Sequence, residues 1–125
     1  METNNGNINI GQCFVLGDIQ EAFSKKYPFL KIDFFEIDKV TNTAKSSFLD
    51  INTKLTKLTS QDELTGINMG HNRTVAELAE DFFNMLGLVA EISRKSGKVW
   101  SVTKLTDSWT LETQNSAAEF ICSLM

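Results

Sequence analysis

The chain repeats itself at an offset of 59 residues, and this repeat constrains its fold more than any other feature. Shifted by that distance, Ile8 aligns with Ile67, and the next three positions again read polar, apolar, glycine. The match continues through two sets of apolar residues spaced i, i+3, i+7 and i+11: Leu16, Ile19, Phe23 and Tyr27, and Val75, Leu78, Phe82 and Leu86. This spacing places each set on one stripe of an amphipathic helix, so it predicts helices at 16–27 and 74–86.

The ends of the two predicted helices carry different signals. Pro28 and Gly87 follow the two apolar stripes, and both residue types end helices. Thr74 and Glu77 form a capping box before the second helix, whereas Val15 occupies the cap position of the first. We therefore expect a sharp start for the second helix and a ragged start near Leu16 for the first.

After each helix the hydrophobic period changes to two, which is typical of strands with one buried face. The apolar positions are Leu30, Ile32 and Phe34 in the first half, and Leu88, Ala90 and Ile92 in the second. Ser96 and Gly97 can form a two-residue hairpin turn, which predicts a return strand over 99–105. In the first half a polar stretch over 38–47 delays the return strand, which we expect within 48–56.

These elements define two β-α-β-β halves, 7–59 and 66–115, after a disordered N-terminus at 1–6. Short helices are expected at the end of each half, near Ser60 and near Asp107, followed by a C-terminal helix around 117–121. One half alone would bury too little apolar surface to be stable, so the halves should share one core. The sequence thus predicts a single α+β domain over 1–125, an internal duplication with about six strands in mixed, largely antiparallel sheets.

The composition is that of an ordinary globular protein. The chain has 125 residues, is 42% hydrophobic and contains nine Phe and one Pro, which excludes a disordered class. A net charge of −4 argues against nucleic-acid and membrane partners. The N-terminal residues lack a signal-peptide pattern, so we expect a cytoplasmic protein in which Cys13 and Cys122 are reduced thiols, unless the termini meet in space.

The second half resembles a group of small bacterial proteins of unknown function. The resemblance lies in Thr74-Val75-Ala76-Glu77-Leu78, Phe82, Gly87-Leu88, Arg94-Lys95-Ser96-Gly97, Val99-Trp100 and Thr106-Asp107-Ser108-Trp109-Thr110-Leu111. It implies an α+β domain, and it implies no activity, substrate or cofactor.

One pair of residues suggests catalysis. His71 is the only histidine and precedes the second predicted helix, and Cys13 precedes the first. If the halves bring these loops together, Cys13 and His71 could act as nucleophile and base in a small thiol-dependent enzyme. The alternative is a buried structural thiol and a solvated loop histidine.

Other chemistry has less support. The acidic residues of the two helices, such as Asp18, Glu77 and Asp81, could attract a hard cation, but carboxylates in the first turns of helices also complement the helix dipole. No dinucleotide, P-loop, zincin or serine-hydrolase motif occurs. We expect neither a metal nor a cofactor.

The remaining candidates are binding residues. Arg94, Lys95 and Lys98 would form a basic tip on the hairpin, with Trp100 beside it. Phe34 and Phe35 must point to opposite faces of their strand, so one of them needs cover from another element, another subunit or a partner. The candidate binding set is Phe35, Arg94, Lys95, Lys98, Trp100 and Trp109. The sequence therefore favours a non-catalytic interaction or structural module that binds a protein or itself, with the Cys13 and His71 enzyme as the alternative.

Overall fold

The computed structural model describes residues 7–9, 15–45, 47–58 and 66–124. Within them the protein is an α+β structure with three α-helices and antiparallel strand pairs. The expectations for the N-terminus at 1–6, for Cys13 and for the helix signal at Ser60 lie outside the described residues.

Helices α1 (Leu16–Lys26) and α2 (Val75–Leu86) confirm the two predicted amphipathic helices. All eight apolar stripe residues are buried, namely Leu16, Ile19, Phe23, Tyr27, Val75, Leu78, Phe82 and Leu86. The rings of Phe34 and Phe82 pack edge to face with their centres 5.1 Å apart. This contact joins the strand that follows α1 to helix α2 in one core. The stripes therefore act as the periodicity predicts, as the helical half of a shared core.

Helix α1 begins cleanly at Leu16, so the expected ragged start is wrong. The Asp18 carboxylate accepts the N–H of Val15 at 3.1 Å, and this bond does part of the work of a conventional cap. Two carbonyls from a distant segment accept the first helical N–H groups: that of Thr53 at 3.1 Å and that of Ile51 at 2.9 Å. Tertiary contacts thus satisfy donors that the local sequence leaves open.

Helix α2 has the same tertiary caps in addition to its capping box. Thr74 Oγ1 accepts the N–H of Glu77 at 3.1 Å, and Glu77 Oε1 accepts the N–H of Thr74 at 2.9 Å. The carbonyls of Trp109 and Asp107 accept the first two helical N–H groups, from Val75 and the next residue, at 3.2 and 2.8 Å. The helix ends at Gly87, whose φ of 69° is the left-handed conformation predicted for this position.

The main sheet has the strand order β2 (Leu30–Phe35), β6 (Val89–Ser96) and β7 (Val99–Val102), and both pairings are antiparallel. Residues Leu30, Ile32 and Phe34 are buried against the helices, as the alternation predicts. The opposite side of this sheet is called the outer face below. Two small antiparallel pairs complete the described strands: β1 (Asn7–Asn9) with β5 (Gly66–Asn68), and β3 (Ile37–Asp38) with β4 (Thr43–Ala44).

The β6–β7 hairpin is confirmed, with two corrections. Its turn residues are Gly97 and Lys98 rather than Ser96 and Gly97, and Gly97 adopts φ 66° as primed hairpin turns require. The return strand ends at Val102, because residues Lys104–Thr106 form a 3-10 helix, η4. The chain leaves the sheet there to bring its next carbonyls to the start of α2.

The return strand expected in the first half does not form. One bond, from the N–H of Leu49 to the carbonyl of Phe34 at 2.8 Å, brings the chain back to the edge of β2. The next residues cap α1 and then form a 3-10 helix, η2 (Leu55–Lys57), while the polar stretch folds into the β3–β4 hairpin. In this segment the peptide groups cap helix α1 instead of pairing with a strand.

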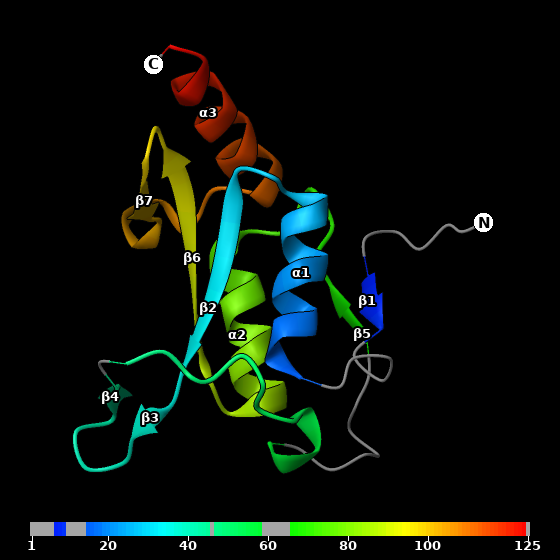
Figure 1. Cartoon of the computed structure of the whole chain (residues 1–125), viewed down its shortest axis with the longest axis vertical. Helices are drawn as coiled ribbons and strands as arrows, with labels where there is room; N and C mark the ends of the chain where they lie inside the picture. Colours follow the sequence, from blue (N-terminus) through cyan, green and yellow to red (C-terminus); the bar gives the residue numbers. More distant parts are fainter. Residues whose placement is uncertain (1–6, 10–14, 46, 59–65, 125) are drawn as a thin grey trace.

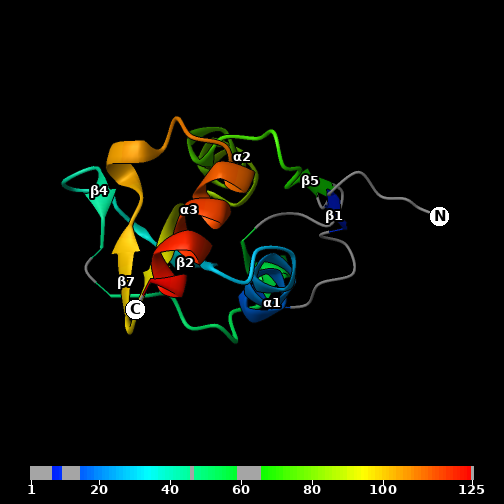
Figure 2. The same cartoon turned by 90° about the horizontal axis from the view of Figure 1, so that it is seen from above.

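Helix α3 (Leu111–Ser123) is longer than the expected C-terminal helix, because Thr110 caps it by accepting the N–H of Thr113 at 3.1 Å. Figures 1 and 2 both place the β1–β5 pair on one side of the molecule and β7 and the β3–β4 hairpin on the other side, with α1 and α2 between them. Within the described residues, no helix has both the length and the apolar character to cross a bilayer.

Candidate interaction surface

Strand β7 is the edge of the described sheet, and its apolar side chains are exposed on both faces. Trp100 and Val102 lie on the outer face and are 41% and 50% exposed, while Val99 points to the opposite face and is 61% exposed. Leu105, just beyond the strand, is fully exposed at 100%. These four residues are called the β7 surface. An edge with apolar residues on both faces is an open site for pairing with another chain.

The backbone of β7 also has peptide groups that point away from β6 and can pair with an added strand. The N–H of Thr103 donates to the carbonyl of Ile92 at 3.0 Å, so the peptide groups at Thr103 face β6. In an antiparallel ladder successive residues alternate between the two sides, which places the N–H and C=O of Trp100 and Val102 on the outer edge. Two residues thus offer donors and acceptors to an added strand.

The Trp100 ring is held across the outer face. The ammonium of Lys31, on β2, lies 5.3 Å from the centre of the ring and 3.5 Å from the Asp33 carboxylate. Ser93, between these strands on the same face, is buried. Trp100 is therefore an aromatic surface held in place by a cation, and its predicted role in binding stays a prediction.

Arg94 is not part of a basic hairpin tip, which corrects that element of the prediction. Its guanidinium points to the helix side, donates to Gln114 Oε1 at 2.9 Å and lies 5.4 Å from the centre of the Trp109 ring. Gln114 is 0% exposed and donates to the carbonyl of Thr106 at 2.6 Å. Arg94 therefore joins β6 to α3, and it also covers part of Trp109.

The basic charge beside β7 comes from lysines at its two ends. Lys95 and Lys98 are exposed near the hairpin turn, as expected, and Lys104 is exposed just after the strand. Lys95 is fixed through its backbone, whose N–H donates to the carbonyl of Phe29 at 2.9 Å. A neutral apolar strand is thus flanked by positive charge at both ends.

Phe35 lies on the outer face, as predicted, and is half-buried. The ring of Phe48, which is 63% exposed, packs on it at 5.0 Å between ring centres. Of the covers considered for this face, the structure provides an element of the same chain. Phe35 therefore contributes to packing more than to the exposed surface.

His71 is exposed in the loop before α2, and Cys13 lies outside the described residues, so the proposed pair is not tested. The His71 ring meets the ring of Tyr27 edge to face at 5.7 Å. Tyr27 is buried, and its hydroxyl donates to the carbonyl of Met69 at 2.6 Å. Burial, with a smaller contribution from the charge of Glu112, raises the pKa of Tyr27 to about 12.

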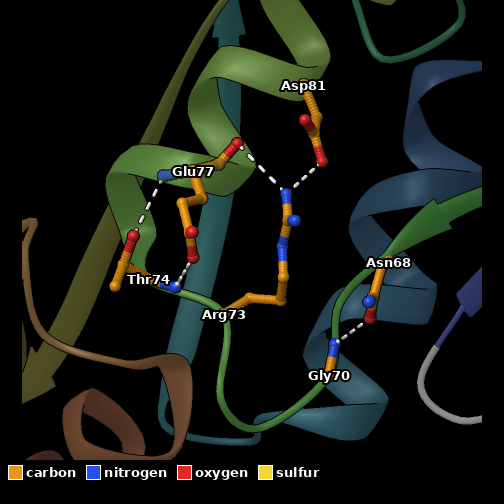
Figure 3. Close-up of polar contacts among 6 residues, drawn as sticks. All are labelled: Asn68, Gly70, Arg73, Thr74, Glu77 and Asp81. Atoms are coloured by element: carbon orange, nitrogen blue, oxygen red, sulfur yellow. Dashed lines mark hydrogen bonds and ion pairs between the residues drawn. The ribbon is translucent and has the colours of Figure 1, made fainter.

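The same loop carries a polar network that includes two acidic residues of α2, Glu77 and Asp81 (Figure 3). Arg73 pairs with Asp81 and donates to the carbonyl of Glu77 at 3.4 Å, and Asn68 accepts the N–H of Gly70 at 2.8 Å. The hydrogen bond from the Thr74 backbone lowers the pKa of Glu77. These carboxylates anchor the loop and the helix start. Among the described residues, no group of three or more His, Cys, Asp or Glu is placed to hold a metal ion.

A pocket of about 210 Å³ lies between α2 and β6, and the sequence reasoning did not predict it. The apolar residues that line it are Val75, Ala76, Ala79, Val89, Ala90, Ile92 and Val102. Glu91, Lys104 and Asp107 add charged groups. It is called the Ala90 pocket below. Three alanines on facing positions of a helix and a strand were the sequence signal that could have indicated it.

Comparisons with protein-family models, with curated proteins and with solved structures found no match to this chain.

Proposed function

We propose that this protein is a non-catalytic interaction module that binds an extended segment of a partner protein by strand addition at β7. One observation carries the proposal: β7 is a sheet edge whose apolar side chains are exposed on both faces. Strand addition would pair the outward peptide groups of Trp100 and Val102 and bury the side chains around them. The same proposal includes a cytoplasmic location and no nucleic-acid or membrane partner, and the net charge of −4 supports the latter.

The charges at the ends of β7 favour a different chain over a second copy. In an antiparallel self-pair that aligns Trp100 with Val102 of the other copy, Lys98 of one copy and Lys104 of the other, just after β7, lie at the same end of the pair. Like charges in such positions are destabilising. The favoured partner is therefore an extended segment with alternating β-branched or aromatic residues and with acidic residues at its ends.

A proline substitution at Val102 tests this proposal by removing one backbone N–H. Val102→Pro removes an N–H that points away from β6, so the β6–β7 ladder keeps its bonds. Peptides selected from a displayed library of extended sequences on the wild-type protein should bind Val102→Pro about tenfold more weakly, since the added strand loses a ladder bond and meets the proline ring. Val102→Thr, which keeps the N–H and the branched shape, should bind them normally.

The outcomes of this selection separate the alternatives. Acid-flanked peptides whose binding weakens with added salt and with Val102→Pro support the proposal. Sedimentation that shows a wild-type dimer abolished by Val102→Pro would make the occupant a second copy and overturn the choice of partner. If no selected peptide distinguishes Val102→Pro from Val102→Thr, strand addition at β7 is wrong.

We further propose that the two β-α-β-β halves, 7–59 and 66–115, derive from a duplication. The tertiary caps support it, since Ile51 and Thr53 bond the start of α1 as Asp107 and Trp109 bond the start of α2. The strands support it too, because Ile8 pairs with Ile67, its partner at the 59-residue offset, and β2 pairs with β6. A two-fold relation between the halves would produce this arrangement.

A further inference from the structure

The edge of β2 that faces away from β6 and the edge of β6 that faces away from β2 present the same backbone pattern. On β2 the carbonyl of Phe34 accepts the N–H of Leu49 at 2.8 Å, and on β6 the carbonyl of Ile92 accepts the N–H of Thr103 at 3.0 Å. Alternation along an antiparallel ladder sends the peptide groups two residues earlier to the same edge. These are the groups of Ile32 on β2 and of Ala90 on β6.

On β2 this second carbonyl is satisfied by a side chain from the neighbouring helix. Gln20, the fifth residue of α1, donates from Nε2 to the carbonyl of Ile32 at 2.8 Å and lies 3.4 Å from Asp33 Oδ1. The Gln20 side chain is half-buried between the helix and the strand. The first half therefore closes its strand edge with a carboxamide.

On β6 the corresponding position holds no such group. The fifth residue of α2 is Ala79, whose methyl group cannot reach a strand carbonyl, and β7 does not extend past Val102 to cover this part of β6 (Figure 1). Ala79 and Ala90 both line the Ala90 pocket. The pocket occupies the place that a glutamine fills in the first half.

The chemistry of the Ala90 pocket matches a primary amide. By the alternation along β6, both the N–H and the C=O of Ala90 point to the edge where the pocket lies, so one donor and one acceptor lie side by side next to apolar residues. At about 210 Å³ it has about seven times the volume of a water molecule in the liquid, about 30 Å³. A carboxamide on a short aliphatic stem satisfies both peptide groups and fills the apolar space.

We propose that the Ala90 pocket binds a primary carboxamide, supplied either by a small free amide or by a glutamine side chain of another protein. This goes beyond strand addition at β7, because it uses a different strand edge and different peptide groups. Carboxylates are disfavoured, since they cannot donate to the Ala90 carbonyl and since Glu91 and Asp107 outnumber Lys104 among the charged residues of the lining.

Titration of the protein with butyramide, followed by the backbone amide signals of Ala79 and Ala90 in ¹⁵N-correlation spectra, tests this proposal. Butyramide should shift both signals saturably, while butyrate and methyl butyrate, which lack an N–H, should leave them unchanged at the same concentration. A peptide with one glutamine, compared with its glutamate counterpart, forms the second arm. Binding of that peptide at least tenfold tighter than butyramide identifies a protein side chain as the source; otherwise the source is a free amide.

Two variants separate binding from folding. Ala79→Gln supplies the chain's own carboxamide and should weaken butyramide binding at least tenfold while keeping or raising the melting temperature. Glu80→Gln introduces the same residue on the exposed side of α2 and should bind as the wild type does. The proposal is overturned if butyramide fails to shift the Ala79 and Ala90 signals, or if Ala79→Gln binds it unchanged. Trp100→Ala, a β7 variant outside the pocket lining, should keep full butyramide binding, so this test is independent of the one at β7.

Discussion

The outer edge of β2 and the stretch of β6 that β7 does not cover differ in one side chain, and that difference separates a closed edge from an open one. Gln20 covers the carbonyl of Ile32 on β2, whereas Ala79 leaves the matching edge of β6 facing a pocket of about 210 Å³. Backbone geometry is otherwise alike, since the Phe34 and Ile92 carbonyls are each bonded by a return segment. A buried peptide group needs a partner. One half provides it internally, and the other half leaves its place to a ligand.

The comparison also shows where stability and recognition are placed. Both helices bury complete apolar stripes and receive tertiary caps, so neither half is less well built. The open features, the Ala90 pocket and the β7 surface, lie together beside β6 in the second half. Because the main sheet and the core are shared, the first half can stabilise the second while the second carries the surfaces for which we propose binding.

The strongest way to break the comparison is to separate the halves. Chains comprising residues 1–60 and 61–125 should each be unfolded alone, because β2 loses β6, β1 loses β5, and each helix loses half of its core. Circular dichroism during heating measures this directly. Cooperative melting of either fragment would show that one half is self-sufficient, and the shared-core account would fail.

Removing the closing side chain of β2 should have a smaller effect. Gln20→Ala leaves the carbonyl of Ile32 without its side-chain donor in a half-buried position, which should cost about 1–3 kcal/mol of unfolding free energy. Urea unfolding measures it, with Glu21→Ala on the exposed side of α1 as the control, expected to stay within about 0.5 kcal/mol. Gln20→Ala should also acquire a second butyramide site, near Ile32. Equal stability of the two variants would mean that Gln20 does not close the edge.

Regular local patterns are what the sequence predicted well. The 3.6-residue and two-residue periods identified the stripes of α1 and α2 and the buried face of β2, because burial acts on neighbouring residues of one element. The same two-residue period could have separated Arg94 from Lys95, which point to opposite faces of β6 and were wrongly grouped in one basic tip. Alignment at 59 residues already placed Gln20 over Ala79, so the difference between the edges was present in the sequence.

Competition between distant segments is what the sequence could not reveal. Residues 48–56 have the composition of a strand, yet the carbonyls of Ile51 and Thr53 bond the start of α1 and the chain turns away from β2. Strand β7, the return strand of the β6–β7 hairpin, ends early for the same reason, because the carbonyls of Asp107 and Trp109 bond the start of α2. Strand pairing and helix capping use the same peptide groups, and only the three-dimensional arrangement decides between them.

A further effect should appear only at alkaline pH, and it comes from a residue of the first half. Tyr27 is the single tyrosine of the chain, and burial raises its pKa from 10.0 to about 12, whereas α2 has Leu86 at the last stripe position. In the unfolded chain the tyrosine loses its proton near pH 10, while the folded protein still keeps it. The unfolded state therefore binds fewer protons between pH 10 and 12, and stability must fall as the pH rises through that window.

Tyr27→Phe isolates this contribution from the lysines that titrate over the same range. The variant loses the hydroxyl bond to Met69 at every pH, but the difference in urea midpoint between wild type and variant should shrink steadily from pH 10 to pH 12. Tyrosinate absorbance of the folded wild type should rise only near pH 12. Glu112→Gln should slightly lower the pH at which the tyrosinate absorbance rises, because the carboxylate adds to the effect of burial on the pKa of Tyr27. A tyrosinate signal that rises near pH 10 in the folded protein would show that Tyr27 is open to solvent and that the first half is less closed than the second.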